Sequence, residues 1–224
     1  MRPELQVTDD PAAAAAELLV SASGHVVLTG GSTPRAAYGI VAERRADWSG
    51  TEIWFTDERC VPPDHEHSNY RMAKEALLDR IHGAVVHRMQ GELGPQDGAA
   101  AYERELRERF GEGMPELGFV LLGVGPDAHT CSLFPGDPAL AERERLAVGV
   151  ETPGMAPLVP RVTLTLPVVN AARRVVFLVT GEDKAEAVAR AFGGDPDPHA
   201  PAGLVAPASG APMLICDEGA AARL

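Results

Sequence analysis

Residues 119–129 read FVLLGVGPDAH, and this stretch decides which fold the sequence predicts. Phe119–Leu122 is a continuous apolar run without a polar alternate face, which is typical of a strand buried on both sides in a parallel sheet. A glycine-rich turn ends the strand and brings Asp127 and His129 directly after it. Ligands of open α/β sheets bind beyond the carboxyl ends of the strands, so this turn is a candidate site.

The segments on both sides of this stretch alternate between short apolar strands and helices. Asp10 before Pro11, and Ser68 before Asn69, carry the side chains that cap helix N-termini. We predict strands over His25–Leu28, Thr51–Phe55, Phe119–Leu122, Val162–Leu166, Val175–Val179 and Pro212–Cys216. We predict helices over Pro11–Ser21, from Pro34 onward, and over Asn69–Ile81, Pro95–Phe110 and Glu182–Phe192, with a short helix at the C-terminal end.

This alternation predicts an α/β fold. We expect a three-layer sandwich whose mainly parallel, Rossmann-like sheet is covered by helices on both faces. No internal repeat and no Ser- or Pro-rich linker divides the sequence. Residues 1–224 are therefore expected to form a single domain.

The composition excludes several classes of function. The net charge of −12, from 20 basic and 32 acidic residues, disfavours nucleic-acid partners because the phosphate backbone attracts basic surfaces. The longest apolar runs, such as Val175–Val179, are too short to span a bilayer, so no membrane partner is expected. The three cysteines are far apart and no apolar leader follows Met1, which together predict a cytoplasmic protein without a disulfide framework.

A second glycine-rich turn, TGGSTP at Thr29–Pro34, lies between a predicted strand and a predicted helix. Its glycines let the backbone approach a ligand, its hydroxyls can donate hydrogen bonds, and the helix dipole favours an anion. The pattern is neither GxGxxG nor a P-loop, so it does not indicate a dinucleotide or a nucleoside triphosphate. A tight turn capped by Ser32 or Thr33 is the structural alternative.

Two polar runs follow the predicted strand Thr51–Phe55. Asp57, Glu58 and Arg59 follow it and are candidates for a pocket, with a solvated, internally ion-paired loop as the alternative. Asp64–His67, which reads DHEH, contains the residue types of a metal site. It supplies no closed four-ligand set, so we predict no metal here.

Asp127 and His129 form the sharpest chemical pattern. An imidazole takes a proton from water near neutral pH, and a carboxylate two residues away can fix its tautomer. No GxSxG elbow is present, which argues against a serine hydrolase. Cys131 is either a nucleophile or, more in keeping with cysteine's usual place, a small buried apolar residue.

Two basic residues outside these turns are candidates for binding a phosphate. Lys184 lies in the first turn of the predicted helix after Gly181, and Arg161 precedes the predicted strand Val162–Leu166. Both are either solvated charges or cations that converge on a ligand phosphate. Together with the Asp–His pair, they indicate an enzyme acting on a small phosphorylated molecule.

In this order, the segments resemble the 6-phosphogluconolactonase family within the larger glucosamine-6-phosphate isomerase/deaminase group. The resemblance covers nearly the whole chain and is carried by LTGGSTP (28–34), WFTDER (54–59), SNY (68–70), GVGPDAHTCSLFPG (123–136), RVTLT (161–165) and GEDK (181–184). Two positions depart from the family pattern. Ala128 stands where the family usually has glycine, and Cys131 stands where alanine is commonest. If position 128 needs a positive φ, alanine there is strained.

The resemblance implies hydrolysis of 6-phospho-D-glucono-1,5-lactone to 6-phospho-D-gluconate, in the oxidative pentose phosphate pathway. On that basis His129 is the general base for water, Asp127 orients it, and Arg59 or backbone amides stabilise the oxyanion. The remaining substrate-binding candidates are Gly30, Gly31, Ser32, Thr33, Asp57, Arg161 and Lys184. No metal or organic cofactor is implied, and the partner is the sugar-phosphate lactone, bound by a monomer or small homo-oligomer.

Two other functions stay open. A sugar-phosphate isomerase or glucosamine-6-phosphate deaminase needs a carboxylate base, which Asp57 could supply. The deaminases also carry an acidic residue soon after the histidine, and the stretch Ser132–Pro135 of this sequence contains none. A non-catalytic sugar-phosphate-binding protein would keep the phosphate turn and lose the Asp–His pair. Both members of that pair are present here, which favours catalysis.

Overall fold

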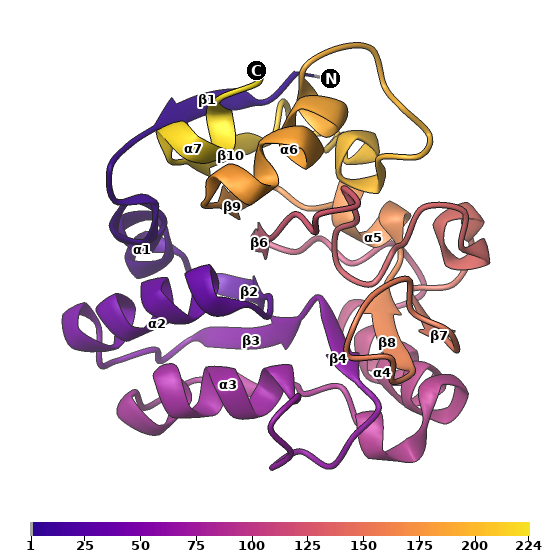
Figure 1. Cartoon of the computed structure of the whole chain (residues 1–224). Helices are drawn as coiled ribbons and strands as arrows, with labels where there is room; N and C mark the ends of the chain where they lie inside the picture. The colour runs from indigo at the N-terminus through magenta and orange to yellow at the C-terminus, as the bar shows by residue number, and fades with distance from the viewer. Residues whose placement is uncertain (1) are drawn as a thin grey trace.

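The computed structural model describes residues 2–224 and contains a seven-stranded sheet in which every strand runs parallel to its neighbours. The strand order is β1-β10-β9-β6-β2-β3-β5 (Figure 1). From β2 the chain continues to β3 and β5 on one side, and from β6 it continues to β9 and β10 on the other side. The strand order therefore reverses between β6 and β2. The strands are β1 (Glu4–Val7), β2 (Gly24–Leu28), β3 (Thr51–Phe55), β5 (Val85–Val86), β6 (Phe119–Leu122), β9 (Val175–Val179) and β10 (Met213–Cys216).

Helices cover both faces of this sheet. Neighbouring side chains on a strand point to opposite faces, and Trp54 contacts Tyr102 of α4 whereas Phe55 contacts Tyr70 of α3. The α/β three-layer fold is therefore confirmed. The helices are α1 (Pro11–Ser21), α2 (Ser32–Arg44), α3 (Asn69–Ala76), α4 (Pro95–Phe110), α5 (Leu166–Asn170), α6 (Ala185–Phe192) and α7 (Glu218–Ala221), with short 3₁₀ turns at Leu78–Arg80, Gly91–Leu93, Pro138–Ala141, Glu182–Lys184 and Pro201–Leu204.

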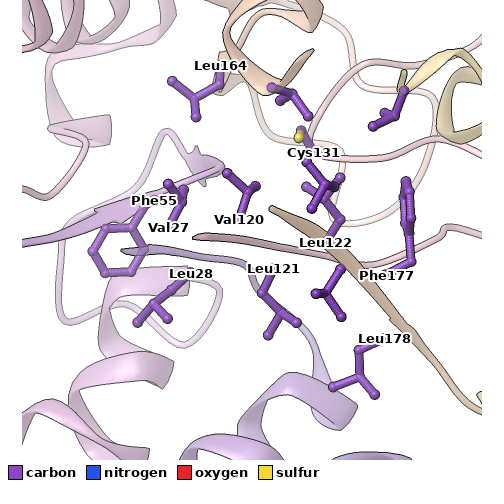
Figure 2. Close-up of a cluster of buried hydrophobic side chains, with 14 of the residues drawn as sticks. Val27, Leu28, Phe55, Val120, Leu121, Leu122, Cys131, Leu164, Phe177 and Leu178 are labelled. Carbon is purple, nitrogen blue, oxygen red and sulfur yellow. The ribbon is translucent and has the colours of Figure 1, made fainter. Parts of the chain in front are cut away.

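The core lies on both sides of the central strands. Val120, Leu121 and Leu122 of β6 are fully buried, and Figure 2 shows Leu121 on one side of the strand and the other two on the opposite side. This explains why the strand has no polar alternate face. No helix within residues 2–224 is long and apolar enough to cross a membrane.

A second sheet corrects the sequence-based prediction. The segment predicted as strand Val162–Leu166 forms β8 (Arg161–Leu164), which lies outside the main sheet and pairs antiparallel with β4 (Asp57–Arg59) and β7 (Ala147–Val150). The polar run at Asp57 is thus a strand, where a solvated loop was the alternative. Strands β1, β5 and β7 were not predicted either, because they have two to four residues and weak apolar patterns.

The two buried tyrosines each fix the carboxyl end of a central strand. The Tyr38 hydroxyl of α2 accepts a hydrogen bond from Thr29 N (2.9 Å) and donates one to Thr29 O (2.8 Å), just after β2. Tyr102 of α4 makes the same two contacts to Phe55 at the end of β3. Burial raises the pKa of both phenols far above the usual value, so they remain neutral donors. These bonds hold the ends of β2 and β3 where the cavity begins.

Replacing Tyr38 by phenylalanine is expected to lower the free energy of unfolding by about 1–3 kcal/mol, because it leaves two buried backbone groups of Thr29 without a partner. Urea denaturation measures this change. Tyr70→Phe is the control, since Tyr70 is only partly buried at the start of α3. Equal stability of the Tyr38 and Tyr70 variants would contradict this role of the hydroxyl.

Candidate active site

A cavity of about 230 Å³ opens at the carboxyl ends of the neighbouring strands β9, β6, β2 and β3. It therefore lies at the point where the strand order reverses, which is the usual ligand site of such sheets. Its walls bring together seven of the residues predicted from the sequence: Gly30, Gly31, Asp57, Arg59, His129, Arg161 and Lys184.

His129 and Asp127 form a close pair at one wall. The Asp127 Oδ1 atom lies 2.5 Å from His129 Nδ1 and also accepts a hydrogen bond from His129 N at 3.1 Å. Burial alone would raise the pKa of the Asp127 carboxyl, but its hydrogen bond and charge interaction with His129 outweigh burial and leave that pKa below its usual value. Because an ionised carboxylate faces Nδ1, the ring carries its proton there and Nε2 is the nitrogen that can act as a base.

Gly125 makes room for this pair. A Cβ atom at position 125 would lie 2.1 Å from His129 Nδ1 and Cε1, and 2.9 Å from Asp127 Oδ1. The backbone of Gly125 in turn donates a hydrogen bond from its N to His129 O (2.9 Å). The turn between Gly125 and His129 therefore closes only because residue 125 has no side chain.

The departures from the family pattern at positions 128 and 131 both lie in left-handed backbone. Ala128 has a φ of 67° and Cys131 a φ of 53°, so alanine occupies a conformation that glycine adopts more easily. Hydrogen bonds from Ala128 N to Gly125 O and from Ala202 N to Ala128 O hold the strained turn in place. Burial raises the pKa of the Cys131 thiol, which keeps it protonated and favours its role as a small apolar residue over that of a nucleophile.

The glycine turn reaches the cavity through its backbone. Gly31 is the N-cap residue of α2, and no side chain within the described residues caps this helix, so its first amides can donate to an anion. Ser32 and Thr33 lie outside the main cavity and line an adjoining one of about 140 Å³, together with Lys184 and both glycines. Neither of the two hydroxyls caps the helix, which was the structural alternative.

Three cations border the main cavity without a carboxylate partner. Arg59 and Arg161 are directly opposite each other in the β4–β8 pairing, and Lys184 follows β9. None of the three forms an ion pair with a side chain of residues 2–224. Like charges placed opposite each other repel, so this arrangement favours an anionic ligand between or near them.

The two arginines donate instead to backbone carbonyls. Arg59 Nη1 binds His67 O at 2.7 Å, while its buried Nε has no hydrogen-bond partner in the described part of the chain. Arg161 is 2% exposed and donates to the carbonyls of Pro157 (3.0 Å) and Val159 (3.3 Å). Burial, with the charge of Arg59, lowers the pKa of the Arg161 guanidinium. A ligand anion beside the two guanidinium groups would offset both the burial of the Arg161 charge and its repulsion by Arg59.

Several contributors to this site were not predicted. Asn69, Thr29, Met155 and Ala156 also line the cavity. Glu58, which the sequence did offer as a pocket candidate, does not line the cavity: it is buried and accepts hydrogen bonds from Asn69 N (2.7 Å) and Tyr70 N (2.8 Å), so it anchors the first turn of α3. Burial raises the pKa of the Glu58 carboxyl, and these hydrogen bonds oppose that shift. The SNY run at 68–70 carried the only sequence signal for Asn69.

Within residues 2–224, no group of three or more His, Cys, Asp or Glu side chains is arranged to hold a metal ion. Around the DHEH run, His65 Nδ1 accepts a hydrogen bond from His67 N at 3.1 Å. That contact orders the loop internally.

Comparison with known proteins identifies relatives over nearly the whole chain. The family described as glucosamine-6-phosphate isomerases/6-phosphogluconolactonase matches residues 6–214. The 6-phosphogluconolactonase of Rattus norvegicus is 44% identical over 184 residues, which cover 80% of this chain and 70% of that protein. The crystal structure of 6-phosphogluconolactonase from Leishmania guyanensis superposes with a TM-score of 0.87 at 28% identity and covers 98% of each chain.

A monomeric glucosamine-6-phosphate deaminase has the same architecture. It superposes with a TM-score of 0.82 over 100% of both chains, at 18% sequence identity. A likeness at that identity concerns the fold alone. Lactonase and deaminase activities therefore share one scaffold, and the side chains around the cavity have to distinguish them.

Proposed function

The chain belongs to the glucosamine-6-phosphate isomerase/6-phosphogluconolactonase family, and from this membership we infer that it hydrolyses 6-phospho-D-glucono-1,5-lactone to 6-phospho-D-gluconate. This reaction lies in the oxidative pentose phosphate pathway. The observation that carries the inference is that His129, held by a carboxylate, lines the same cavity as three cations that form no ion pair within residues 2–224. One phosphorylated ester spanning that cavity would meet both.

His129 starts the proposed reaction. Nε2 takes a proton from a water molecule, whose oxygen attacks the lactone carbonyl carbon. Asp127 stabilises the imidazolium that forms and keeps Nε2 directed at the water. The carbonyl oxygen becomes an oxyanion, and Arg59, which lines the cavity, is the proposed donor for it. When the intermediate collapses, the carbon–oxygen bond of the ring breaks and the imidazolium returns its proton to the ring oxygen.

The phosphate is assigned to the other end of the cavity. The first amides of α2, which no side chain of residues 2–224 caps, would donate to a phosphate dianion bound in the small adjoining cavity. Ser32 and Thr33 line that cavity too. Lys184 borders both spaces, and Arg161 adds a second positive charge on the main cavity. The proposed chemistry uses neither a metal nor an organic cofactor, because a lactone yields to general-base attack.

The acidic residue that a glucosamine-6-phosphate deaminase carries soon after its histidine is missing from this sequence. Directly after His129 the chain reads Thr130–Pro135 without a carboxylate, and the ring of Phe134 packs 4.5 Å from the His129 ring instead. A non-catalytic binder would have no use for the oriented imidazole. Parallel assays separate these functions: acid release from the lactone above its spontaneous rate supports the proposal, whereas ammonia release from glucosamine 6-phosphate, or neither product, overturns it.

Replacing Lys184 by methionine is expected to raise KM for the lactone about tenfold to a hundredfold and to change kcat much less, because a charge-assisted bond to phosphate is lost while His129 is untouched. Steady-state kinetics, with inorganic phosphate as a competing ligand, measure the effect. The chain has one other lysine, and Lys74→Met is the matched control because Lys74 lies on the surface in an ion pair with Asp79. Equal KM values for the two variants would place the phosphate elsewhere.

Three further properties remain predictions. A cytoplasmic location agrees with the three free cysteines, since reducing compartments keep thiols unpaired. The absence of a nucleic-acid partner follows from the acidic net charge of −12. A monomer or small homo-oligomer is the expected state, and sedimentation measures it directly.

A further inference from the structure

We propose that Asp57 is a positioning residue of this reaction, acting on His129 through Ser132, and that it carries no proton in the cycle. The inference rests on the lactonase activity proposed above. It also assigns a role to Ser132, which does not line the cavity and which the sequence did not single out.

Two hydroxyl groups and one side-chain amide donate to the Asp57 carboxylate, and the amide, Asn69 Nδ2, lies 3.4 Å from Oδ1. Ser132 Oγ donates to Oδ2 at 2.7 Å, and Thr56 Oγ1 donates to Oδ1 at 2.9 Å. Asp57 is 5% exposed and Ser132 is fully buried, so both bonds are shielded from water. A hydroxyl has a single proton, and within residues 2–224 Ser132 Oγ donates to no acceptor other than this carboxylate. With these donors around it, the carboxylate is held in one orientation as a hydrogen-bond acceptor.

Ser132 connects Asp57 to the segment that carries His129. Its N donates to Thr163 Oγ1 of β8 at 3.1 Å, so the residue is fixed through both its backbone and its side chain. The two residues between His129 and Ser132 are Cys131, in left-handed backbone, and Thr130, whose Oγ1 donates to Gly123 O at 2.9 Å. A shift at Ser132 is therefore transmitted to His129 over a short, constrained segment.

Asp57 is also connected to the glycine turn. Asn69 Nδ2 donates to Asp57 O at 2.9 Å, and the Asn69 side chain fills the space in which a Cβ of residue 30 would lie. Thr56 Oγ1, which binds the carboxylate, also lies 3.2 Å from Thr29 Oγ1. Asp57 thus fixes the position of the His129 segment relative to the glycine turn assigned to phosphate. The distance between these two places is the distance that one substrate molecule has to span. A misplacement of about 1 Å can lower a rate about a hundredfold.

The test is a double-mutant cycle on the full-length enzyme with Asp57→Asn, Ser132→Ala and the combination. We expect each single variant to lower kcat about tenfold to a hundredfold, with KM within about threefold of the parent, because the phosphate end keeps Lys184 and the α2 amides. The double variant should lose no more activity than the less active of the two single variants, because both changes act on the same contact between Asp57 and Ser132. The pH profile of kcat should keep its shape, since His129 remains the general base in every variant.

Thr165→Val is the matched control, because Thr165 is another fully buried hydroxyl, which donates to Arg145 O away from the cavity. The thermal unfolding midpoint of the Thr165→Val enzyme should fall while its kcat stays at the parental value. This result would distinguish a loss of stability from a loss of His129 positioning. Parental kcat in Ser132→Ala, losses that multiply in the double variant, or removal of one limb of the pH profile in Asp57→Asn alone would each overturn the proposal. If the parent enzyme itself fails to hydrolyse the lactone, the function assigned above fails instead.

Discussion

Turnover of the lactone by the His129→Ala enzyme is expected to fall by about 10²- to 10⁴-fold, the usual contribution of a positioned general base. The alanine variant keeps the cations and the uncapped amides of α2, so KM should change little. The loss should therefore appear almost entirely in kcat, as expected when an interaction made in the transition state is removed. Initial rates, corrected for the spontaneous hydrolysis of the lactone, measure it.

A surface histidine provides the control for this experiment. His82 has 72% of its side chain exposed and lies outside the cavity, so His82→Ala should keep the parental kcat. Asp127→Asn should lie between the two, because it keeps the shape of the side chain and removes the charge that fixes the Nδ1 proton. Unchanged turnover in His129→Ala would exclude the proposed base.

Replacing Gly125 by alanine should lower kcat about a hundredfold while leaving all catalytic side chains present. The added Cβ would lie 2.1 Å from the His129 ring, so the ring has to move by an ångström or more. Displacements of that size disturb the alignment of a base with its water. Kinetics together with the thermal unfolding midpoint measure the effect, since a folded but slow enzyme is the expected outcome.

Gly113→Ala is the companion variant, because a Cβ at that position meets no atom within 4 Å. It should behave like the parent enzyme in both measurements. Parental kcat in a folded Gly125→Ala enzyme would show that the position of the His129 ring tolerates this shift, and would contradict the role given to the turn.

The sequence predicts the central sheet well because its strands are coded locally. The apolar runs at Thr51–Phe55, Phe119–Leu122 and Val175–Val179 coincide with β3, β6 and β9, and Asp10 caps α1 as expected. The family resemblance likewise rests on local motifs. Alternating strands and helices then place the turns after β2, β6 and β9 at one edge of the sheet, which explains why Gly30, Gly31, His129 and Lys184 line one cavity.

The remaining features depend on contacts between distant segments. The small sheet brings Asp57–Arg59 against Arg161–Thr163, about a hundred positions apart, and no local pattern encodes that pairing. The burial of Asp57 and its bond to Ser132 are of the same kind. A polar run after a strand is typical of a solvated loop, and only tertiary hydrogen bonds make it part of a buried wall.

The most direct test is a crystal structure of the enzyme with 6-phosphogluconate bound. We predict that the product carboxylate lies within hydrogen-bond reach of His129 Nε2, at about 3 Å, and that the phosphate contacts the first amides of α2 and Lys184 Nζ. The product would then connect the two ends of a single cavity. A phosphate seated against His129, or a product bound outside this cavity, would contradict the proposed mechanism.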